Sequence, residues 1–193
     1  CRCGYLRAHR LRREFFKQRG ATASDHGHLT AKTADLSKKD AEELYLKVVS
    51  GKASSSEADL FRGQMLTEMA RMSLDDGLTL QIHAGSRRNH HAGVLDIYGR
   101  DKGFDIPGRT DYVEALKPLL NAVGFEPDLK VILFTLDETT YSRELAPLAG
   151  AYPCLLLGPP WWFFDSYEGI KRFREATTET CGFYNTAGFN DDT

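Results

Sequence analysis

Short apolar runs alternate with amphipathic stretches along this chain. The apolar runs at 78–85, 130–137 and 154–158 are typical of buried strands, and weaker strand patterns lie at 21–25 and 183–189. Between them, apolar residues recur at helical spacing. The predicted helices cover residues 5–18, 37–50, 54–75, 110–123, 139–150 and 167–181. Strands that are joined by helices pair in parallel through right-handed crossovers, so this order predicts an α/β fold with a parallel sheet.

Local signals support several of these helix boundaries. Ser54 and Glu57 fit a capping box at the start of a helix, and Asp165 and Glu168 resemble another. Pro118 falls inside a predicted helix, so we expect a kink or a helix boundary at that residue.

Polar clusters follow four of the predicted strands, at 23–28, 81–89, 158–165 and 188–192. Chemistry at the C-terminal ends of parallel strands is typical of (β/α)8 barrels of the TIM type. The chain has 193 residues, and a complete barrel needs about 250. We therefore expect residues 1–193 to form a single partial barrel domain, containing about strands 4–8 with the helices between them. A doubly wound open sheet is the alternative.

Composition removes several classes of function. Lys and Arg number 25 against 27 Asp and Glu, so the basic excess of a nucleic-acid-binding protein is missing. The longest strongly apolar stretch, 154–164, contains Gly and Pro and is too short to span a bilayer. No GxGxxG or P-loop motif follows a strand, so nucleotide binding has no support. The first residue is Cys1, so we expect the natural start of the protein to be absent.

The four cysteines give a further indication of class. They include no CxxC pair, which disfavours a zinc ribbon. Cys154 and Cys181 are isolated, and we expect both to be reduced core residues of a cytoplasmic protein.

His83 is a candidate site residue because of its place at the end of a strand. Strand alternation directs Leu80 and Ile82 to one face and Gln81 and His83 to the other. A neutral imidazole there could bind a metal or polarise a substrate oxygen. The alternative is a structural histidine that is satisfied by hydrogen bonds.

Arginines and tryptophans follow two of the strands. Arg87 and Arg88 lie in a long irregular segment, 86–109, which at this length is expected to be functional or disordered. An arginine at a barrel mouth suits a carboxylate or phosphate, although it can equally be a solvated loop residue. Trp161 and Trp162 could form the wall of a site and exclude water, or simply pack.

Carboxylates and histidines follow two further strands. In Asp25-His26-Gly27-His28 the carboxylate could move a proton, and a His-x-His pair could face a metal, although Gly27 favours a loop over a continuing strand. A capping aspartate with two surface histidines is the alternative. Asp192, with Asp191 before it, could be a metal ligand or a general base.

Longer blocks of sequence are more specific than these single residues. They are QIHAGSRRN at 81–89, ILFTLDETTYSRELAPLAGAYP at 132–153 and GPPWWFFDSYEGIKRFREATTETCGFYNTAGFNDD at 158–192, with ASDHG at 23–27 upstream. Together they resemble the uronate isomerase (glucuronate isomerase) family of the amidohydrolase superfamily. The resemblance covers nearly the whole chain.

The resemblance implies a deformed (β/α)8 barrel that holds one divalent metal ion, usually taken as zinc. The implied activity is that of an intramolecular oxidoreductase, an aldose–ketose isomerase. It converts D-glucuronate to D-fructuronate and D-galacturonate to D-tagaturonate by moving a proton between C2 and C1 through a cis-enediol. The implied partner is a small uronic acid, and neither a nucleic acid nor a membrane is expected as a partner. Assembly into a homo-oligomer is possible under this interpretation.

Site residues are implied position by position. Asp25, of the ASDHG segment, His83, which resembles the fifth-strand histidine, and Asp192 are implied as catalytic residues. Arg88 resembles the active-site arginine five residues after that histidine, and Trp161 the site tryptophan, so both are implied to bind substrate. Asp192 resembles the last-strand aspartate that meets the metal.

The chain also departs from the family pattern. The first-strand His-x-His metal pair is not in the chain, and His26 and His28 follow the fourth strand instead. An arginine normally stands two residues after the metal aspartate, beyond Thr193. We therefore expect a C-terminal-half fragment with an incomplete metal site, inactive alone. If the register slips by one residue, Asp191 takes the place of Asp192.

Three hypotheses of function follow. The first is the isomerase. The second is a metal-dependent hydrolase on the same scaffold, in which His83 and Asp192 activate water. The third is a non-catalytic module that binds acidic sugars through Arg87 and Arg88.

Overall fold

A four-stranded parallel sheet forms the centre of the protein. The computed structural model describes residues 1–188, so Asp191 and Asp192 lie outside the described part. The strand order is β1-β2-β5-β6, and every pairing in this sheet is parallel. The strands are β1 (Ala23–His28), β2 (Thr79–Ala84), β5 (Val131–Thr135) and β6 (Leu155–Leu157). The predicted α/β fold with a parallel sheet is confirmed.

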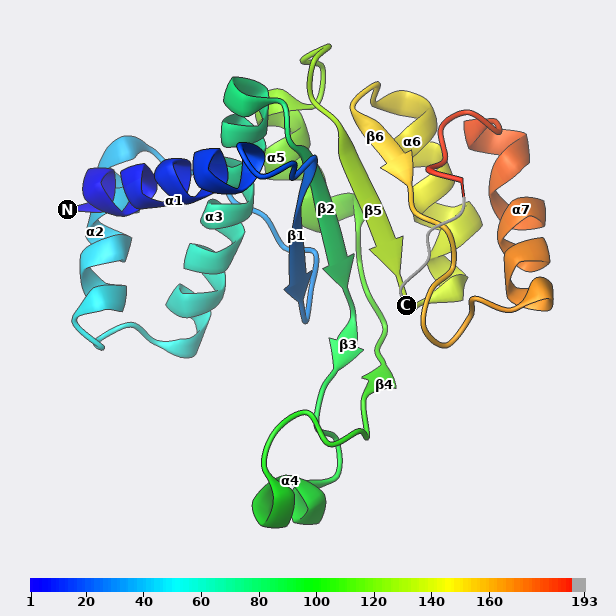
Figure 1. The fold of residues 1–193 in the computed structure, drawn as a ribbon, viewed down its shortest axis with the longest axis horizontal. Helices are drawn as coiled ribbons and strands as arrows, with labels where there is room; N and C mark the ends of the chain where they lie inside the picture. Colours follow the sequence, from blue (N-terminus) through cyan, green and yellow to red (C-terminus); the bar gives the residue numbers. More distant parts are fainter. Residues whose placement is uncertain (189–193) are drawn as a thin grey trace.

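Helices precede, connect and follow these strands. The helices are α1 (Arg2–Lys17), α2 (Lys38–Val49), α3 (Ser55–Asp76), α5 (Val113–Val123), α6 (Ala146–Ala151) and α7 (Tyr167–Cys181). A 3-10 turn (Glu138–Thr140) and a π-helical turn (Tyr141–Leu145) precede α6. Figure 1 shows α1, α2 and α3 gathered at the β1 end of the sheet, and α6 and α7 at the β6 end.

The core lies between one face of the sheet and four helices. Alternate strand residues, among them Leu80, Ile82 and Leu133, are at most 1% exposed. They join one apolar cluster with residues of α3, α5, α6 and α7. Burial of this much apolar surface is the main favourable term in folding. Cys154 and Cys181 are free thiols buried in the same cluster, as the sequence predicts.

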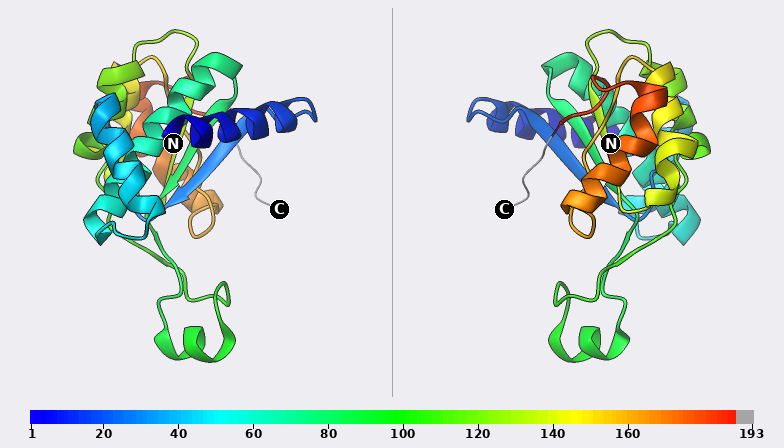
Figure 2. Two further views of the ribbon diagram at one scale, coloured as in Figure 1. Left: turned by 90° about the vertical axis from the view of Figure 1, so that its left-hand side faces the viewer. Right: turned by 90° about the vertical axis from the view of Figure 1, so that its right-hand side faces the viewer.

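Residues 86–107 form an arm that leaves the sheet. The arm starts with β3 (Ser86–Arg87), continues through the short helix α4 (Ala92–Tyr98) and returns as β4 (Ile106–Pro107). β3 and β4 pair antiparallel. Both views in Figure 2 show the arm projecting away from the other elements. The expected irregular segment therefore contains regular structure of its own.

The helix signal was right at α3 and wrong at the cap of α7, and Pro118 is not a helix boundary. Ser54 and Glu57 make the predicted capping box, and Gly77 ends the helix with a φ of 75°. The cap of α7 is Ser166, whose side chain accepts from the Gly169 amide, and not Asp165. Helix α5 continues through Pro118. Burial of its apolar side stabilises the helix beyond the lost backbone hydrogen bond.

The two outer strands also differ from expectation. β1 continues through Gly27 to His28, because both residues pair with β2 in register. Of the expected strand at 183–189, the described residues form one parallel bridge, between Leu157 and Thr186. Asn185 and Ala187 hydrogen-bond with Leu157 on either side of that bridge. Within residues 1–188, strand pairing at this edge is therefore limited to this bridge.

Strand order separates the two fold alternatives. Within residues 1–188 the strands follow one another across the sheet in chain order. A doubly wound sheet has a reversal of order and helices on both faces. The observed order therefore disfavours the doubly wound alternative.

Candidate functional site

The Asp25–His83 pair is the centre of the candidate site. Both side chains extend from the sheet face opposite the core, on neighbouring strands β1 and β2. His83 Nδ1 forms a hydrogen bond with Asp25 Oδ1. The His83 side chain is 15% exposed and that of Asp25 is 54% exposed. The pair is therefore enclosed at the imidazole and open to solvent at the carboxylate.

The hydrogen bond sets the chemistry of both partners. Burial acts to raise the pKa of Asp25, but the hydrogen bond from His83 and the attraction of its ring outweigh burial, so the pKa is lowered. An ionised carboxylate at Nδ1 favours the tautomer in which Nδ1 carries the proton. Nε2 then keeps its lone pair and can accept a hydrogen bond or a proton.

Two aromatic rings enclose His83. The Phe134 ring from β5 stacks on the imidazole, with 4.0 Å between centroids and 15° between planes. Trp161, in the loop after β6, meets it at 71° with centroids 4.6 Å apart. Sequence reasoning missed Phe134, although alternation along 131–135 places this residue on the face opposite the core.

The neighbouring Trp162 has an unusual backbone. Its φ is 55°, in the left-handed region that bulky residues seldom adopt. Such conformations concentrate at functional sites. Here the turn allows Trp161 to contact His83 while Trp162 contacts Arg88, whose guanidinium carbon lies 5.5 Å from the ring centroid.

Arg88 reaches the same region from the base of the arm. Its Nη1 lies 3.4 Å from Asp105 Oδ2 and 3.9 Å from Asp101 Oδ1. Asp105 also accepts from the Asn89 amide at 2.8 Å, which holds the turn after Arg88. Both ion pairs are long and the Arg88 side chain is 56% exposed, so they hold the arginine weakly, although Asp105 itself is only 10% exposed.

These residues share one cavity. It has a volume of about 370 Å³, and its lining comprises Gly27, His28, Leu29, His83, Ala84, Ser86, Arg87, Arg88 and Trp161. The structure therefore brings together His83, Arg88 and Trp161, with Asp25 bound to the imidazole. Asp192 and Asp191 lie outside the described residues.

His26 and His28 lie on the helix-facing side of β1. Their rings are nearly parallel, with centroids 6.4 Å apart, and both contribute to a second cavity between α1 and α3. Burial, then the nearby His28, lowers the pKa of His26 to about 4. Within residues 1–188, no three His, Cys, Asp or Glu side chains are arranged to hold a metal ion. The geometry gives no support to a metal site at this pair.

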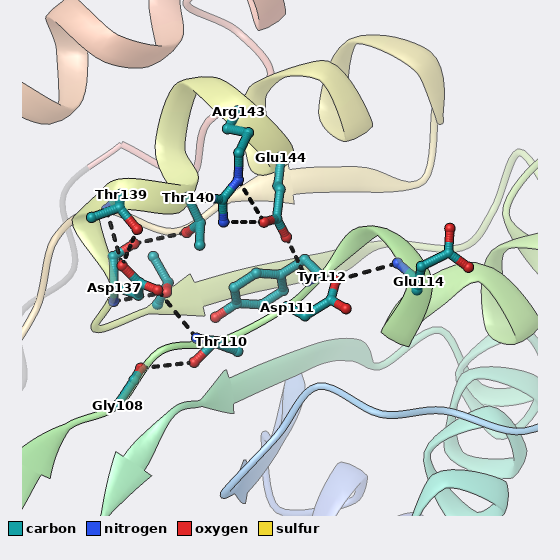
Figure 3. Close-up of polar contacts among 11 residues, drawn as sticks. Gly108, Thr110, Asp111, Tyr112, Glu114, Asp137, Thr139, Thr140, Arg143 and Glu144 are labelled. Atoms are coloured by element: carbon teal, nitrogen blue, oxygen red, sulfur yellow. Dashed lines mark hydrogen bonds and ion pairs between the residues drawn. The ribbon is translucent and has the colours of Figure 1, made fainter.

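A buried polar network fastens the return of the arm to the end of β5 (Figure 3). The Tyr112 amide donates to Glu144 Oε2 at 2.7 Å, and the Tyr112 hydroxyl donates to the Phe134 carbonyl at 3.1 Å. The Thr110 amide donates to Asp137 Oδ2 at 3.1 Å. Sequence reasoning missed this network, because its partners are distant in the chain.

Membrane insertion finds no support in the helices. None of those within residues 1–188 combines the length and apolarity needed to span a bilayer.

Comparison with known proteins gives consistent matches. The sequence profile of a family described as glucuronate isomerase matches residues 4–192. The uronate isomerase of Rhizobium meliloti (strain 1021) is 70% identical over 190 residues, which are 98% of this chain and 40% of that protein. The uronate isomerase of Brucella canis is 68% identical over 190 residues, 98% of this chain and 41% of that protein. The chain thus spans about 40% of the length of these relatives.

Comparison with solved structures identifies the same family. Glucuronate isomerase from Caulobacter crescentus superposes with a TM-score of 0.96 at 68% identity, covering 98% of this chain and 40% of that one. Uronate isomerase from Thermotoga maritima gives a TM-score of 0.89 at 29% identity, covering 98% and 42%.

Proposed function

Because this chain belongs to the glucuronate isomerase family, we propose that the whole protein interconverts a uronic acid and its keto form. The substrates are D-glucuronate, which becomes D-fructuronate, and D-galacturonate, which becomes D-tagaturonate. The observation that carries this proposal is the Asp25–His83 pair beside one cavity that Arg88 and Trp161 also line. A metal-dependent hydrolase is not favoured, because the named relatives are isomerases.

The proposed scaffold is a sector of a closed (β/α)8 barrel. Parallel strands that follow in chain order, with helices on one face, support this architecture. In a barrel the opposite face, which carries His83, becomes the interior. Residues 1–193 then form one partial barrel domain of a longer protein, and the remaining strands complete both the barrel and its site.

His83 is the proposed proton carrier. The isomerisation removes the proton from C2, passes through an enediol and adds a proton at C1, while a proton moves between the two oxygens. Nε2 of His83 keeps a lone pair and His83 lines the cavity, so Nε2 can exchange a proton with a substrate oxygen. Asp25 has a lowered pKa and is a weak base; its role is to orient the ring and stabilise it when protonated.

Arg88 and Trp161 are the proposed substrate-binding residues. A uronate carries a carboxylate at the end of the chain remote from C1, and a guanidinium binds a carboxylate through two oxygens. The weak pairs of Arg88 with Asp101 and Asp105 can be exchanged for this contact. Trp161 Nε1 is buried and has no hydrogen-bond partner within residues 1–188, so it can donate to a sugar hydroxyl.

A divalent metal, zinc, is part of the proposal, with Asp192 as one ligand. When bound, such an ion would stabilise negative charge on the enediolate oxygens. The described residues do not form a complete coordination set. We therefore derive no step through the metal from them.

The proposed setting is the cytoplasm, with a small uronic acid as partner. Buried free thiols at Cys154 and Cys181 are typical of proteins in a reducing compartment. The near balance of acidic and basic residues does not favour a nucleic-acid partner.

The decisive assay supplies the whole protein with D-glucuronate and D-galacturonate and measures ketose formation. We expect turnover of at least one, and a raised KM for uronate in Arg88→Ala. Parallel assays with lactone, ester and amide substrates test the hydrolase; their hydrolysis without ketose formation would overturn the isomerase. Binding of glucuronate without any turnover would support the non-catalytic module instead.

The role of Asp192 needs its own variant. Asp192→Asn keeps the size of the side chain and removes its charge, so we expect it to abolish turnover. Undiminished turnover would remove Asp192 from the proposed site.

A further inference from the structure

The His83 imidazole is restrained by more than its hydrogen bond to Asp25. One hydrogen bond at Nδ1 leaves the ring free to tilt through small rotations about its Cβ–Cγ bond, and a tilt redirects Nε2. The Phe134 ring lies flat against the imidazole, at 4.0 Å between centroids, and blocks such a tilt on that face. Stacking therefore fixes a degree of freedom that the hydrogen bond does not.

Phe134 is itself firmly held. Its register partner on β2 is His83, so the two side chains extend from the same face of the sheet. The Phe134 side chain is 1% exposed. Its carbonyl accepts the Tyr112 hydroxyl, which ties this position to the buried polar network of Figure 3.

Gly158 supplies the space that the Phe134 ring occupies. A Cβ at residue 158 would lie 2.4 Å from Phe134 Cδ1 and 2.5 Å from Cε1. The Gly158 amide donates to the Leu133 carbonyl at 2.9 Å, so the backbone is held close to β5. The φ of Gly158 is not among the positive values, so the position requires glycine for space and not for conformation.

We propose that Phe134, in the space left by Gly158, is a positioning residue that holds His83 Nε2 toward the cavity. Phe134 is not among the residues that line this cavity, so it acts through His83 and not on the substrate. The catalytic part of this inference rests on the proposed function. Small errors of placement at a reacting group cost up to about 100-fold in rate.

The first test compares two matched substitutions in the whole protein. Phe134→Leu keeps an apolar side chain but removes the flat ring, and we expect kcat to fall about 10- to 100-fold with little change in KM. The control is Phe173→Leu, the same change at a core phenylalanine that is also 1% exposed and packs on Tyr141. It should lower the melting temperature and keep kcat. Equal kcat in the two variants would overturn the proposal.

The second test uses Gly158 to displace the ring indirectly. Gly158→Ala should lower kcat because the new methyl group collides with Phe134. In the double variant Gly158→Ala/Phe134→Ala, the Cγ, Cδ1 and Cε1 atoms that the new methyl group meets are absent, so the losses of the two single variants, Gly158→Ala and Phe134→Ala, should be far from additive. If the losses in kcat simply multiply, Gly158 does not act through Phe134, and the proposed role of Gly158 is overturned.

The third test needs no turnover. In histidine-labelled protein without substrate, the ring resonances of His83, identified by their loss in His83→Gln, should shift when Phe134→Leu removes the aromatic ring current. Unchanged resonances would contradict the stack. If the unmodified protein forms no ketose, the proposed function fails, whereas this measurement still decides whether Phe134 stacks on His83.

Discussion

The two faces of strand β2 carry opposite kinds of residue. Leu80 and Ile82 point into the helix-covered core and are fully buried. Gln81 and His83 point the other way and are partly exposed. Six consecutive residues thus contribute both to the stability of the fold and to the candidate chemistry, in strict alternation.

This difference shows why strand register matters here. A shift of β2 by one residue would exchange the two sets, placing His83 in the core and Ile82 at the site. The parallel pairings with β1 and β5 hold the register on both sides of β2. Substitutions on one face should therefore change activity, and those on the other should change stability.

The largest expected effect on activity comes from a substitution on the sheet face opposite the core. His83→Gln removes the ring that Asp25 orients, so kcat should fall about 10²- to 10⁴-fold, the usual contribution of a general acid–base group. The melting temperature should change little, because His83 lies outside the apolar core. Steady-state kinetics and thermal unfolding check both parts. Full activity in this variant would remove His83 from the site.

The neighbouring residue should behave in the opposite way. Ile82→Ala leaves a cavity between β2 and the helices and should lower the free energy of unfolding by about 2–5 kcal/mol. The folded fraction should keep its kcat. Denaturant titration measures the first quantity and active-site-normalised kinetics the second. A stable Ile82→Ala protein with impaired kcat would break the comparison.

His26, on the helix-facing side of β1, should make the stability of the protein depend on pH. The folded pKa of His26 is about 4, below its ordinary value of 6.5. Well above pH 6.5 the residue is neutral in both states and its titration has no effect on stability. Between pH 6.5 and 4 the unfolded chain takes up a proton that the folded protein resists, so stability falls as pH falls, by up to about 3 kcal/mol.

The measurement compares the original protein with His26→Gln over this pH range. Glutamine does not titrate, so the stability difference between the two should change between pH 6.5 and 4 and stay constant above pH 7. The constant part reports the packing of the side chain. A difference that is independent of pH would contradict the assigned burial of His26.

The smallest effect on stability is expected at the N-terminus of helix α3, one of the helices that cover the sheet. Ser54→Ala removes the side chain that accepts from the Glu57 amide and should cost about 1 kcal/mol of stability with unchanged kcat. Ser55→Ala, one residue further on, is the control, because that position does not cap the helix. Equal losses in the two variants would show that the capping box contributes nothing measurable.

Much of the framework follows from local sequence. Three features depend only on residues close together in the chain. They are the capping box at Ser54, the alternation of buried and partly exposed residues in β2, and the end of α3 at Gly77. Local signals failed where tertiary contacts outweigh them. Pairing with β2 keeps Gly27 in a strand, and packing against the core carries α5 through Pro118.

The candidate site was predictable in its parts but not in its assembly. Strand alternation indicates the face of His83, whereas the contact with Phe134 depends on the register between two strands about 50 residues apart. The bond between Tyr112 and Glu144 likewise joins distant segments. The roles of Asp25, His83, Arg88, Trp161 and Asp192 stay predictions.

The base of the arm has a consequence for protein engineering. The chain leaves and re-enters the sheet region through Gly85 and Gly108, which are joined by a hydrogen bond of 2.7 Å from the Gly108 amide to the Gly85 carbonyl. Because the arm is closed at its base, we expect changes within α4, residues 92–98, to leave the spacing of the strands unaltered; Asp101, which pairs with Arg88, lies outside this range. The tip of the arm is thus the place to introduce an affinity tag or a fluorescent probe while His83 keeps its neighbours.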